Sequence, residues 1–197
     1  MGQNQRQKAL AGTLSGLLFF STLAFAQVNP FSILGKVVTT SMDARTKSEV
    51  TADTEISAGA SRRLLDNKKA EWAGVTVLVF AQHAVIAGAV KTAEVKKLVE
   101  EIVRQDKRIR SLKNELQVGD TGSLARDTAL EAEINAKLTA AKGVSSVNMR
   151  WCATGGHVIL MGIAQSPSEA GLAAATVRAI KGVRSLKSHL RVVPKKN

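Results

Sequence analysis

The sequence predicts an α+β protein of two tandem αββαβ modules, each with a three-stranded mixed sheet packed by two helices. Three observations predict it. Residues 53–118 align without a gap on residues 127–192, so that each position has a counterpart 74 residues later. In each copy a helical apolar stripe precedes two β-rich runs and a second helix. The runs 83–90 and 157–164 are apolar at nearly every position, which is typical of strands covered on both faces.

The repeat keeps glycines, charges and apolar positions in register. Asp53-Thr54 aligns with Asp127-Thr128, Gly88 with Gly162, and the segment 110–113 with 184–187, both reading Arg-Ser-Leu-Lys. A match of this length indicates two copies of one module of about 65–70 residues. Because modules that small bury little apolar surface alone, we expect the two to pack against each other.

The first helix of each module is predicted from a four-residue apolar spacing. Asp53 is the predicted N-cap of this helix in the first module. The stripe consists of Ile56, Ala60 and Leu64 in the first copy and Leu130, Ile134 and Leu138 in the second.

A β-hairpin is predicted to follow each first helix. In the first module it comprises residues 74–80, a turn at Ala81-Gln82 and the strand 83–90; in the second it comprises 144–153, a turn at Gly155-Gly156 and 157–164. We expect helices to cover one face of the second strand and the partner module to cover the other.

The second helix of the second module has a well-defined predicted start, since Ser166-Pro167-Ser168-Glu169 combines a capping box with proline at the first helical position. It should extend to about Ile180 and stop near Gly182. Its counterpart should begin after Thr92. A last strand, at 109–118 and 183–193, completes each module.

The N-terminal segment 1–26 is predicted to be an export signal. A basic start precedes an apolar run and Ala24-Phe25-Ala26, which fits a small-x-small cleavage pattern. The alternative is an uncleaved membrane anchor, but the run is shorter than the roughly 20 residues of a spanning helix. The predicted organisation is signal 1–26, extended leader 27–52, modules 53–118 and 127–193, linker 119–126 and basic tail 194–197.

The charge balance predicts an anionic partner. The chain carries a formal net charge of +12, or +10 without the two basic residues of the signal. Export would make an envelope surface a better partner than nucleic acid, for which the sequence also lacks interleaved aromatics. Cys152, the single cysteine, is predicted to be a buried inert thiol rather than a reactive one. No cysteine lies just after the predicted signal, so the predicted mature form has no lipidation cysteine.

These features together resemble the BON domain of bacterial envelope proteins. The resemblance rests on the Asp-Thr helix starts, the Val-Ile-Leu-Met-Gly run with Gly162, its counterpart Gly88, and the closing strand that begins Gly182-Val183-Arg184-Ser185. Asp43-Ala44-Arg45-Thr46 followed by Asp53 is similar to the segment before the first module in dual-BON outer-membrane lipoproteins.

The resemblance implies a non-catalytic periplasmic protein that binds phospholipid or supports outer-membrane integrity and stress resistance. It implies no cofactor. In the lipid-anchored relatives an aromatic commonly follows the Asp-Thr start of the second module, where this chain has Ala129.

Catalytic and metal chemistry are not indicated by the sequence. Serines are present, but no sequence motif links one of them to a histidine and a carboxylate that would activate it as a nucleophile. His83 and His157 occupy equivalent places, and a paired metal site is the alternative to two exposed turn histidines, but no cluster of acidic or thiol ligands stands near them. His189 offers no stronger case.

The candidate binding site is the second helix of the second module and its C-terminal end, where an apolar face has basic edges. The same face could instead pack against the other module. An interaction or osmotic-stress protective protein without direct lipid binding is the alternative function. The candidate phospholipid-binding residues are Gly171, Leu172, Ala174, Ala175, Arg178, Lys181 and Arg184.

Overall fold

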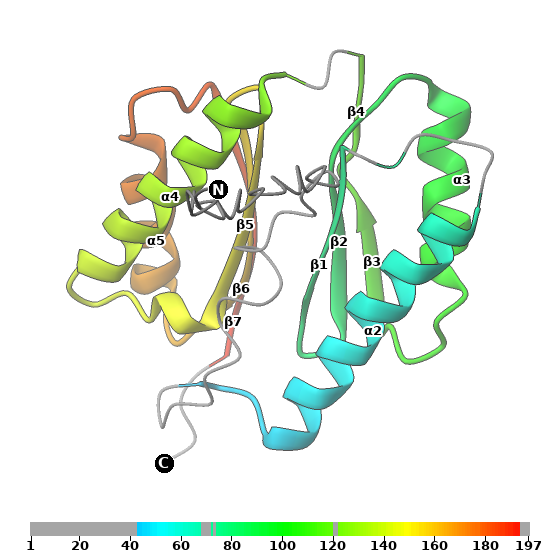
Figure 1. Cartoon of the computed structure of the whole chain (residues 1–197). Coiled ribbons are helices and arrows are strands. Elements are labelled where there is room, and N and C mark those ends of the chain that lie inside the picture. The colour runs from blue at the N-terminus through cyan, green and yellow to red at the C-terminus, as the bar shows by residue number, and fades with distance from the viewer. Residues whose placement is uncertain (1–42, 68–71, 73, 120–121, 194–197) are drawn as a thin grey trace, which may run out of the picture.

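A computed structural model describes residues 43–67, 72, 74–119 and 122–193. The predicted export signal and basic tail lie outside the described residues, as does most of the predicted leader. Each module has the predicted order of helix, two strands, helix and strand, and the predicted fold class is confirmed (Figure 1). The first module contains α2 (Lys47–Asp66), β1 (Val75–Phe80), β2 (His83–Val90), α3 (Ala93–Arg104), β3 (Ser111–Asn114) and β4 (Gln117–Val118).

The second module repeats this order after a short linker. A 3-10 turn, Ser146–Asn148, leads into its hairpin. It contains α4 (Leu124–Ala140), β5 (Met149–Thr154), β6 (His157–Ala164), α5 (Pro167–Arg178) and β7 (Ser185–Val192).

Both sheets are mixed, as the sequence predicts. β1 pairs with β2, and β5 with β6, in an antiparallel hairpin; β3 and β4 then pair with β2, and β7 with β6, in parallel. The hairpin turns Ala81-Gln82 and Gly155-Gly156 have positive φ at both positions, the backbone that a two-residue hairpin requires. A crossover helix joins the antiparallel hairpin to the parallel strand in each module.

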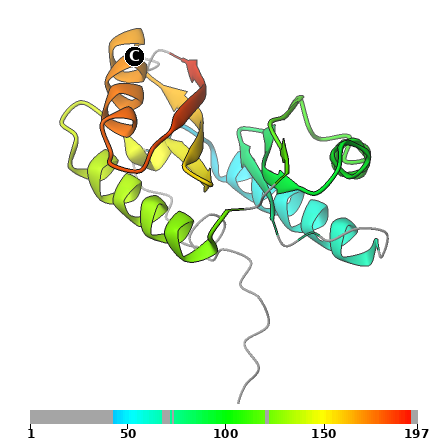
Figure 2. The same cartoon turned by 90° about the horizontal axis from the view of Figure 1, so that it is seen from above.

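The two sheets pack face to face, and the helices cover their outer faces (Figures 1 and 2). Alternate residues of β1, β2, β5 and β6 point to their own helices or to the other module. The expectation that β2 and β6 are covered on both faces is therefore confirmed. The core between the modules consists of Leu78, Phe80, Ala81, Val85 and Ala87 from the first and Cys152, Ile159, Met161 and Ile163 from the second.

Gly88 and Gly162 stand where the hairpin strands approach most closely. A Cβ on Gly88 would lie 1.8 Å from the carbonyl oxygen of Gly74, and one on Gly162 would lie 2.0 Å from that of Asn148. Both residues also have positive φ, of 112° and 134°. The two conditions exclude a side chain at either position.

The predicted start of the first helix is wrong. α2 begins at Lys47 with Thr46 as its N-cap, and Thr46 and Glu49 form a full capping box. Asp53 therefore lies inside the helix. Its carboxylate accepts hydrogen bonds from the backbone N–H groups of Ala81 and Gln82, each at 2.7 Å, so it caps the hairpin turn instead of the helix. The last residues of the predicted extended leader are consequently helical.

The closing strand is continuous in the second module and interrupted in the first, where β3 and β4 replace the single strand predicted. Asn114 stands at the break, and its side chain bonds backbone groups before and after it in the chain. Its Nδ2 donates to the carbonyl of Lys96, and its Oδ1 accepts from the N–H of Leu116. Ser188 stands at the equivalent position of β7 and is too short to make both bonds.

Candidate functional site

The helix α5 lies on the outer face of the second sheet. Ser166 caps it through the N–H of Glu169, and Pro167 is in its first turn. The reciprocal bond of the predicted capping box is shifted by one residue, because the Glu169 carboxylate accepts from the N–H of Gln165 and not from that of Ser166. Glu169 also accepts from the N–H of Ser145, so backbone donors hydrogen-bond both oxygens of this buried carboxylate, which holds the start of α5 against the preceding loop.

The inner face of α5 packs on its own module. Ala173 and Val177 are fully buried in the core of the second module, together with Ile180 just beyond the helix. The other module lies across the opposite face of the sheet (Figure 2). The alternative that the alanine-rich face packs against the other module is therefore wrong.

Six of the seven candidate phospholipid-binding residues are exposed. Leu172 is 42% exposed. Ala174 differs, since it is buried and contributes to packing rather than to the outer surface. The exposed residues are Gly171, Leu172, Ala175, Arg178, Lys181 and Arg184.

The three basic candidates recur in the first module. Arg104, Lys107 and Arg110 stand 74 residues before Arg178, Lys181 and Arg184, and all six side chains belong to exposed residues. We call the second set the α5 basic corner.

The carboxylates around the two sets differ. In the first module Arg104 pairs with Glu100, and Asp106 pairs with Arg108. Among the described residues no ion pair joins a carboxylate to the α5 basic corner. Ala174 and Ile180 stand at the positions of Glu100 and Asp106. The corner is therefore a cationic surface without local neutralisation.

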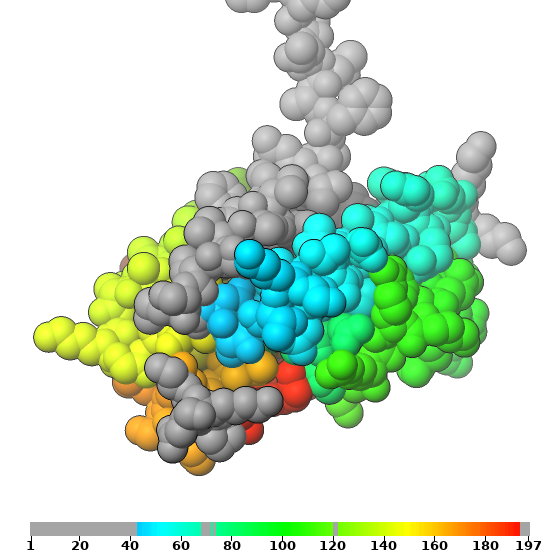
Figure 3. All heavy atoms as spheres, turned by 90° about the horizontal axis from the view of Figure 1, so that it is seen from below, coloured from blue at the N-terminus to red at the C-terminus, as the bar shows by residue number. Residues whose placement is uncertain are grey.

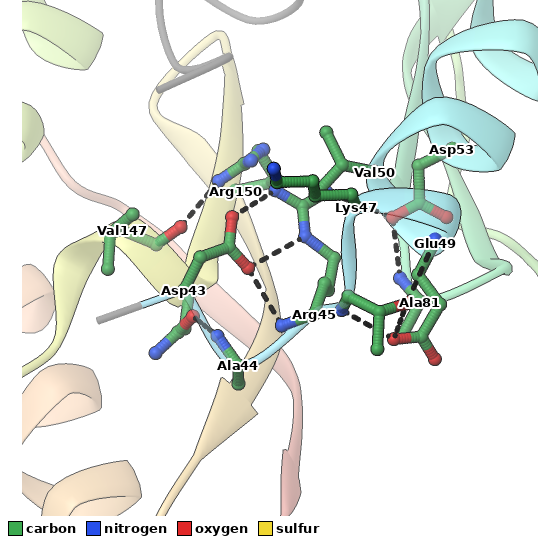
Figure 4. Close-up of polar contacts among 12 residues, drawn as sticks. Asp43, Ala44, Arg45, Lys47, Glu49, Val50, Asp53, Ala81, Val147 and Arg150 are labelled. Atoms are coloured by element: carbon green, nitrogen blue, oxygen red, sulfur yellow. Dashed lines mark hydrogen bonds and ion pairs between the residues drawn. The ribbon is translucent and has the colours of Figure 1, made fainter. Parts of the chain in front are cut away.

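A buried polar cluster, which we call the clamp, joins the start of the described chain to both modules (Figure 4). The Arg45 guanidinium bonds Asp43 at 2.8 and 3.1 Å and Asp53 at 2.9 Å. The N–H of Ala44 donates to Oδ1 of Asn148 in the second module at 2.7 Å. The side chains of Asp43, Arg45 and Asp53 are at most 4% exposed. The segment before α2 thus fastens one module to the other.

The charges of the clamp are balanced around an aromatic ring. Arg45 lies over Phe80 at 4.2 Å from the ring centroid, and Arg150 of the second module at 5.4 Å. Burial, which alone would raise the pKa of Asp43, is outweighed by the hydrogen bonds and charge of Arg45, and the pKa falls below its usual value. Burial and the charge of Arg45 lower the pKa of Arg150 to about 10. The sequence signal for this cluster was Asp43-Ala44-Arg45, but the pattern does not tell which carboxylates the arginine binds.

The histidines and Cys152 form structural contacts. Nδ1 of His83 lies 2.6 Å from Oγ of Ser111, and Nδ1 of His157 lies 2.7 Å from Oγ of Ser185. Cys152 is buried, and burial, with a smaller effect of Glu131, raises the pKa of its thiol to about 12. Within the part of the chain that the structure describes, no group of three or more histidine, cysteine or acidic residues could hold a metal ion.

The fold and the α5 basic corner define a protein of two small α+β modules with a cationic surface on one of them. A model of one domain family, the BON domain, matches residues 52–120 and again residues 126–194. The chain therefore belongs to the BON domain family and contains two tandem BON domains. BON domains are associated with membrane and phospholipid binding and are typically non-catalytic. Of the described helices, none combines the length and apolar character needed to cross a membrane.

One relative is a protein of Anaplasma centrale described as an uncharacterized protein in the gshII 5′ region. It is 30% identical over 125 residues, which are 61% of this chain and 83% of the relative. Two solved structures of CdsD, a structural protein of the type III secretion system of Chlamydia trachomatis, align at 17% and 16% identity with TM-scores of 0.32 and 0.31. These alignments cover 70% and 68% of this chain but 63% and 64% of the CdsD chains, just under two thirds of their length.

Proposed function

We propose that this dual-BON protein is a non-catalytic envelope protein whose second module binds anionic phospholipid surfaces through the α5 basic corner. The observation that carries the proposal is the contrast between the two modules. In the first module Arg104 pairs with Glu100, and Asp106 stands between the equivalent basic residues in the sequence, whereas Ala174 and Ile180 occupy those two positions beside the corner. Each Lys or Arg beside an anionic bilayer contributes about 1 kcal/mol, so the corner supplies a useful attraction.

The apolar part of the surface is small. Leu172, Gly171 and Ala175 are exposed on the outer side of α5, and a helix lying on a bilayer needs such a face beside its charges. One exposed leucine adds little insertion energy, so binding rests mainly on charge and should weaken as salt rises. The proposed location is the periplasm, reached by a cleaved signal, with peripheral contact to the outer membrane and a role in its integrity or in stress resistance.

The test is co-sedimentation of the protein with phosphatidylglycerol and with phosphatidylcholine vesicles across a salt series. We expect binding to the phosphatidylglycerol vesicles alone. The double variant Arg178→Glu/Lys181→Glu should lose at least about tenfold in affinity. The matched control is Arg104→Glu/Lys107→Glu, which makes the same charge change at the equivalent positions of the first module. The lower net charge alone should weaken its affinity for the vesicles by no more than about threefold relative to the wild type.

Two results would contradict the proposal. Equal losses in both double variants would show that net charge, and not the corner, governs binding. No binding to either vesicle at low salt would favour the alternative function, an interaction or osmotic-stress protective protein without direct lipid contact. Thermal unfolding of each variant checks that the fold is retained.

A further inference from the structure

The closing strands of the two modules carry a second basic surface, separate from the α5 basic corner. Leu112 and Leu116 of the first module, and Leu186 and Leu190 of the second, pack into their own modules' cores. The residues between them therefore point to the opposite face, toward the other module. We call this surface the β3–β7 seam; its charged strand-side residues are Lys113, Glu115, Lys187, His189 and Arg191, and Arg110 stands just before β3 at one end of it.

Glu115 is the seam's one carboxylate, and it is already engaged. Its oxygens lie 2.6 Å from Nζ of Lys187 and 3.0 Å from Nε2 of His189. Arg110 and Arg191 have no ion pair with a carboxylate in the described part of the chain. The seam thus combines two arginines without an acidic partner and one carboxylate that Lys187 and His189 already contact.

These two arginines come from different modules, and their backbone positions lie at the same end of the seam. The N–H of Arg110 donates to the carbonyl of Gln82 at 2.8 Å, which places it at the β1–β2 turn. Arg191 is the register partner of Ile163, and Ile163 packs in the same core as Ala81 of that turn. Figure 3 shows this end of the molecule, where the red atoms of the end of β7 lie beside green atoms of the first module.

The electrostatics of this end agree with the placement. Burial lowers the pKa of Arg191, and the charge of Arg110 lowers it further. Burial and then the charges of Arg191 and Arg110 lower the pKa of His83. Glu49 and Asp53 act in the opposite direction on Arg191, but the carboxylates of both accept hydrogen bonds from their own neighbours. The three basic groups therefore lie close enough to act on one another, and Glu49 and Asp53 offset part of their charge.

The other end of the seam offers a comparison within the same chain. Arg184 is the repeat counterpart of Arg110, but Gln117 stands at the counterpart of Arg191. Only one end therefore has a pair of arginines contributed by two modules. A pair of guanidinium groups is well suited to a phosphate, because each can donate two parallel hydrogen bonds to its oxygens.

We infer that Arg110 and Arg191, with His83 beside them, bind a phosphate group. The phosphate belongs either to a phospholipid headgroup or to a soluble phosphate compound, and both have the same recognition chemistry. The site requires both modules, because each supplies one arginine. It is independent of the α5 basic corner.

The first test is calorimetric titration of the full chain with inorganic phosphate at fixed ionic strength. We expect saturable binding at one site, weakened at least about tenfold in Arg110→Gln/Arg191→Gln. The control Arg62→Gln/Arg126→Gln removes the same charge from exposed arginines elsewhere and should bind within about twofold of the wild type. No saturable binding, or equal weakening in both double variants, would overturn the inference.

A histidine resonance gives a local readout. Bound phosphate should raise the pKa of His83, which Arg110, Arg191 and Asp53 face, and this shift should be absent in Arg110→Gln/Arg191→Gln. Gln117→Arg should create a second phosphate site at the opposite end, with Arg184. A wild-type His83 titration that phosphate does not move would contradict the assignment.

Vesicles containing phosphatidic acid identify the source of the phosphate. If Arg110→Gln/Arg191→Gln loses affinity for these vesicles as well as for free phosphate, the ligand is a headgroup; if it loses only free phosphate, the ligand is soluble. The variant Arg178→Glu/Lys181→Glu should keep phosphate binding, so the failure of one site can be told from the failure of the other.

Discussion

Glu115 and His189 occupy the same position in the two copies of the repeat, 74 residues apart, and their side chains contact each other at 3.0 Å. Residues at equivalent positions meet in this way when two modules are related by an approximate two-fold axis that passes close to both. The core between the modules has the same relation: Leu78 and Cys152 are equivalent positions, and both belong to it. The duplicated module therefore packs on itself as a homodimer would.

Removal of Arg45 should destabilise the protein strongly. Arg45→Met leaves the buried carboxylates of Asp43 and Asp53 without their cation, and breaking a buried ion pair from one side costs about 3–5 kcal/mol. Urea unfolding measures the loss. The control Arg104→Met breaks an exposed pair with Glu100 and should cost less than about 1 kcal/mol. Similar losses in the two variants would show that the clamp adds nothing beyond a surface ion pair.

Alanine at the central glycine of the second module should be poorly tolerated. Gly162→Ala places a Cβ 2.0 Å from the carbonyl oxygen of Asn148 at a φ of 134°, and we expect at least about 2 kcal/mol of destabilisation. Gly171→Ala is the control, because no atom beyond its chain neighbours and the nearby backbone of α5 lies within 4 Å of its Cβ position. It should be neutral or stabilising by up to about 1 kcal/mol. Thermal unfolding distinguishes the two.

The ion pair of Asp106 should make stability depend on acid pH. Hydrogen bonding from Arg108, partly opposed by burial, lowers the pKa of Asp106 from 3.8 to about 2. A carboxyl whose pKa is lower in the folded state stabilises that state above its unfolded pKa, and this contribution is lost as the pH falls through the folded pKa. Asp106→Asn should therefore lose about 1–2 kcal/mol at pH 7. The difference from the wild type should shrink between pH 4 and pH 2, as pH-dependent urea unfolding will measure; a constant difference would contradict this origin.

Cys152 should report the separation of the two modules. It lies in the core between them, and burial raises the pKa of its thiol to about 12. In the folded state a reagent therefore reaches Cys152 poorly, and little of the thiol is in the reactive thiolate form. A thiol reagent should modify it only as fast as the core opens. Ala129→Cys adds a thiol at an exposed position and should react many-fold faster. In Arg45→Met, Cys152 should react faster than in the wild type if the clamp holds the modules together.

The role of Asp53 shows where sequence reasoning failed. An aspartate before an apolar stripe is a good N-cap by local rules, but the observed N-cap is Thr46, seven residues closer to the N-terminus. Asp53 instead accepts from a turn 28 residues away, with Oδ2 bonded to the N–H of Ala81. The choice between the two roles depends on a contact between segments that are distant in the sequence, which a local pattern does not contain.

The sequence by itself determined the two modules, the order of elements, the strands covered on both faces and the buried cysteine, because repeat register and apolar periodicity are properties of the chain alone. Only the tertiary structure decided that the outer face of α5 is turned away from the other module, that Arg45 joins Asp43 and Asp53, and that one end of the β3–β7 seam has an arginine from each module. The first and last of these depend on how one module turns relative to the other. That orientation is set by face-to-face packing of two sheets, which brings together residues more than seventy positions apart.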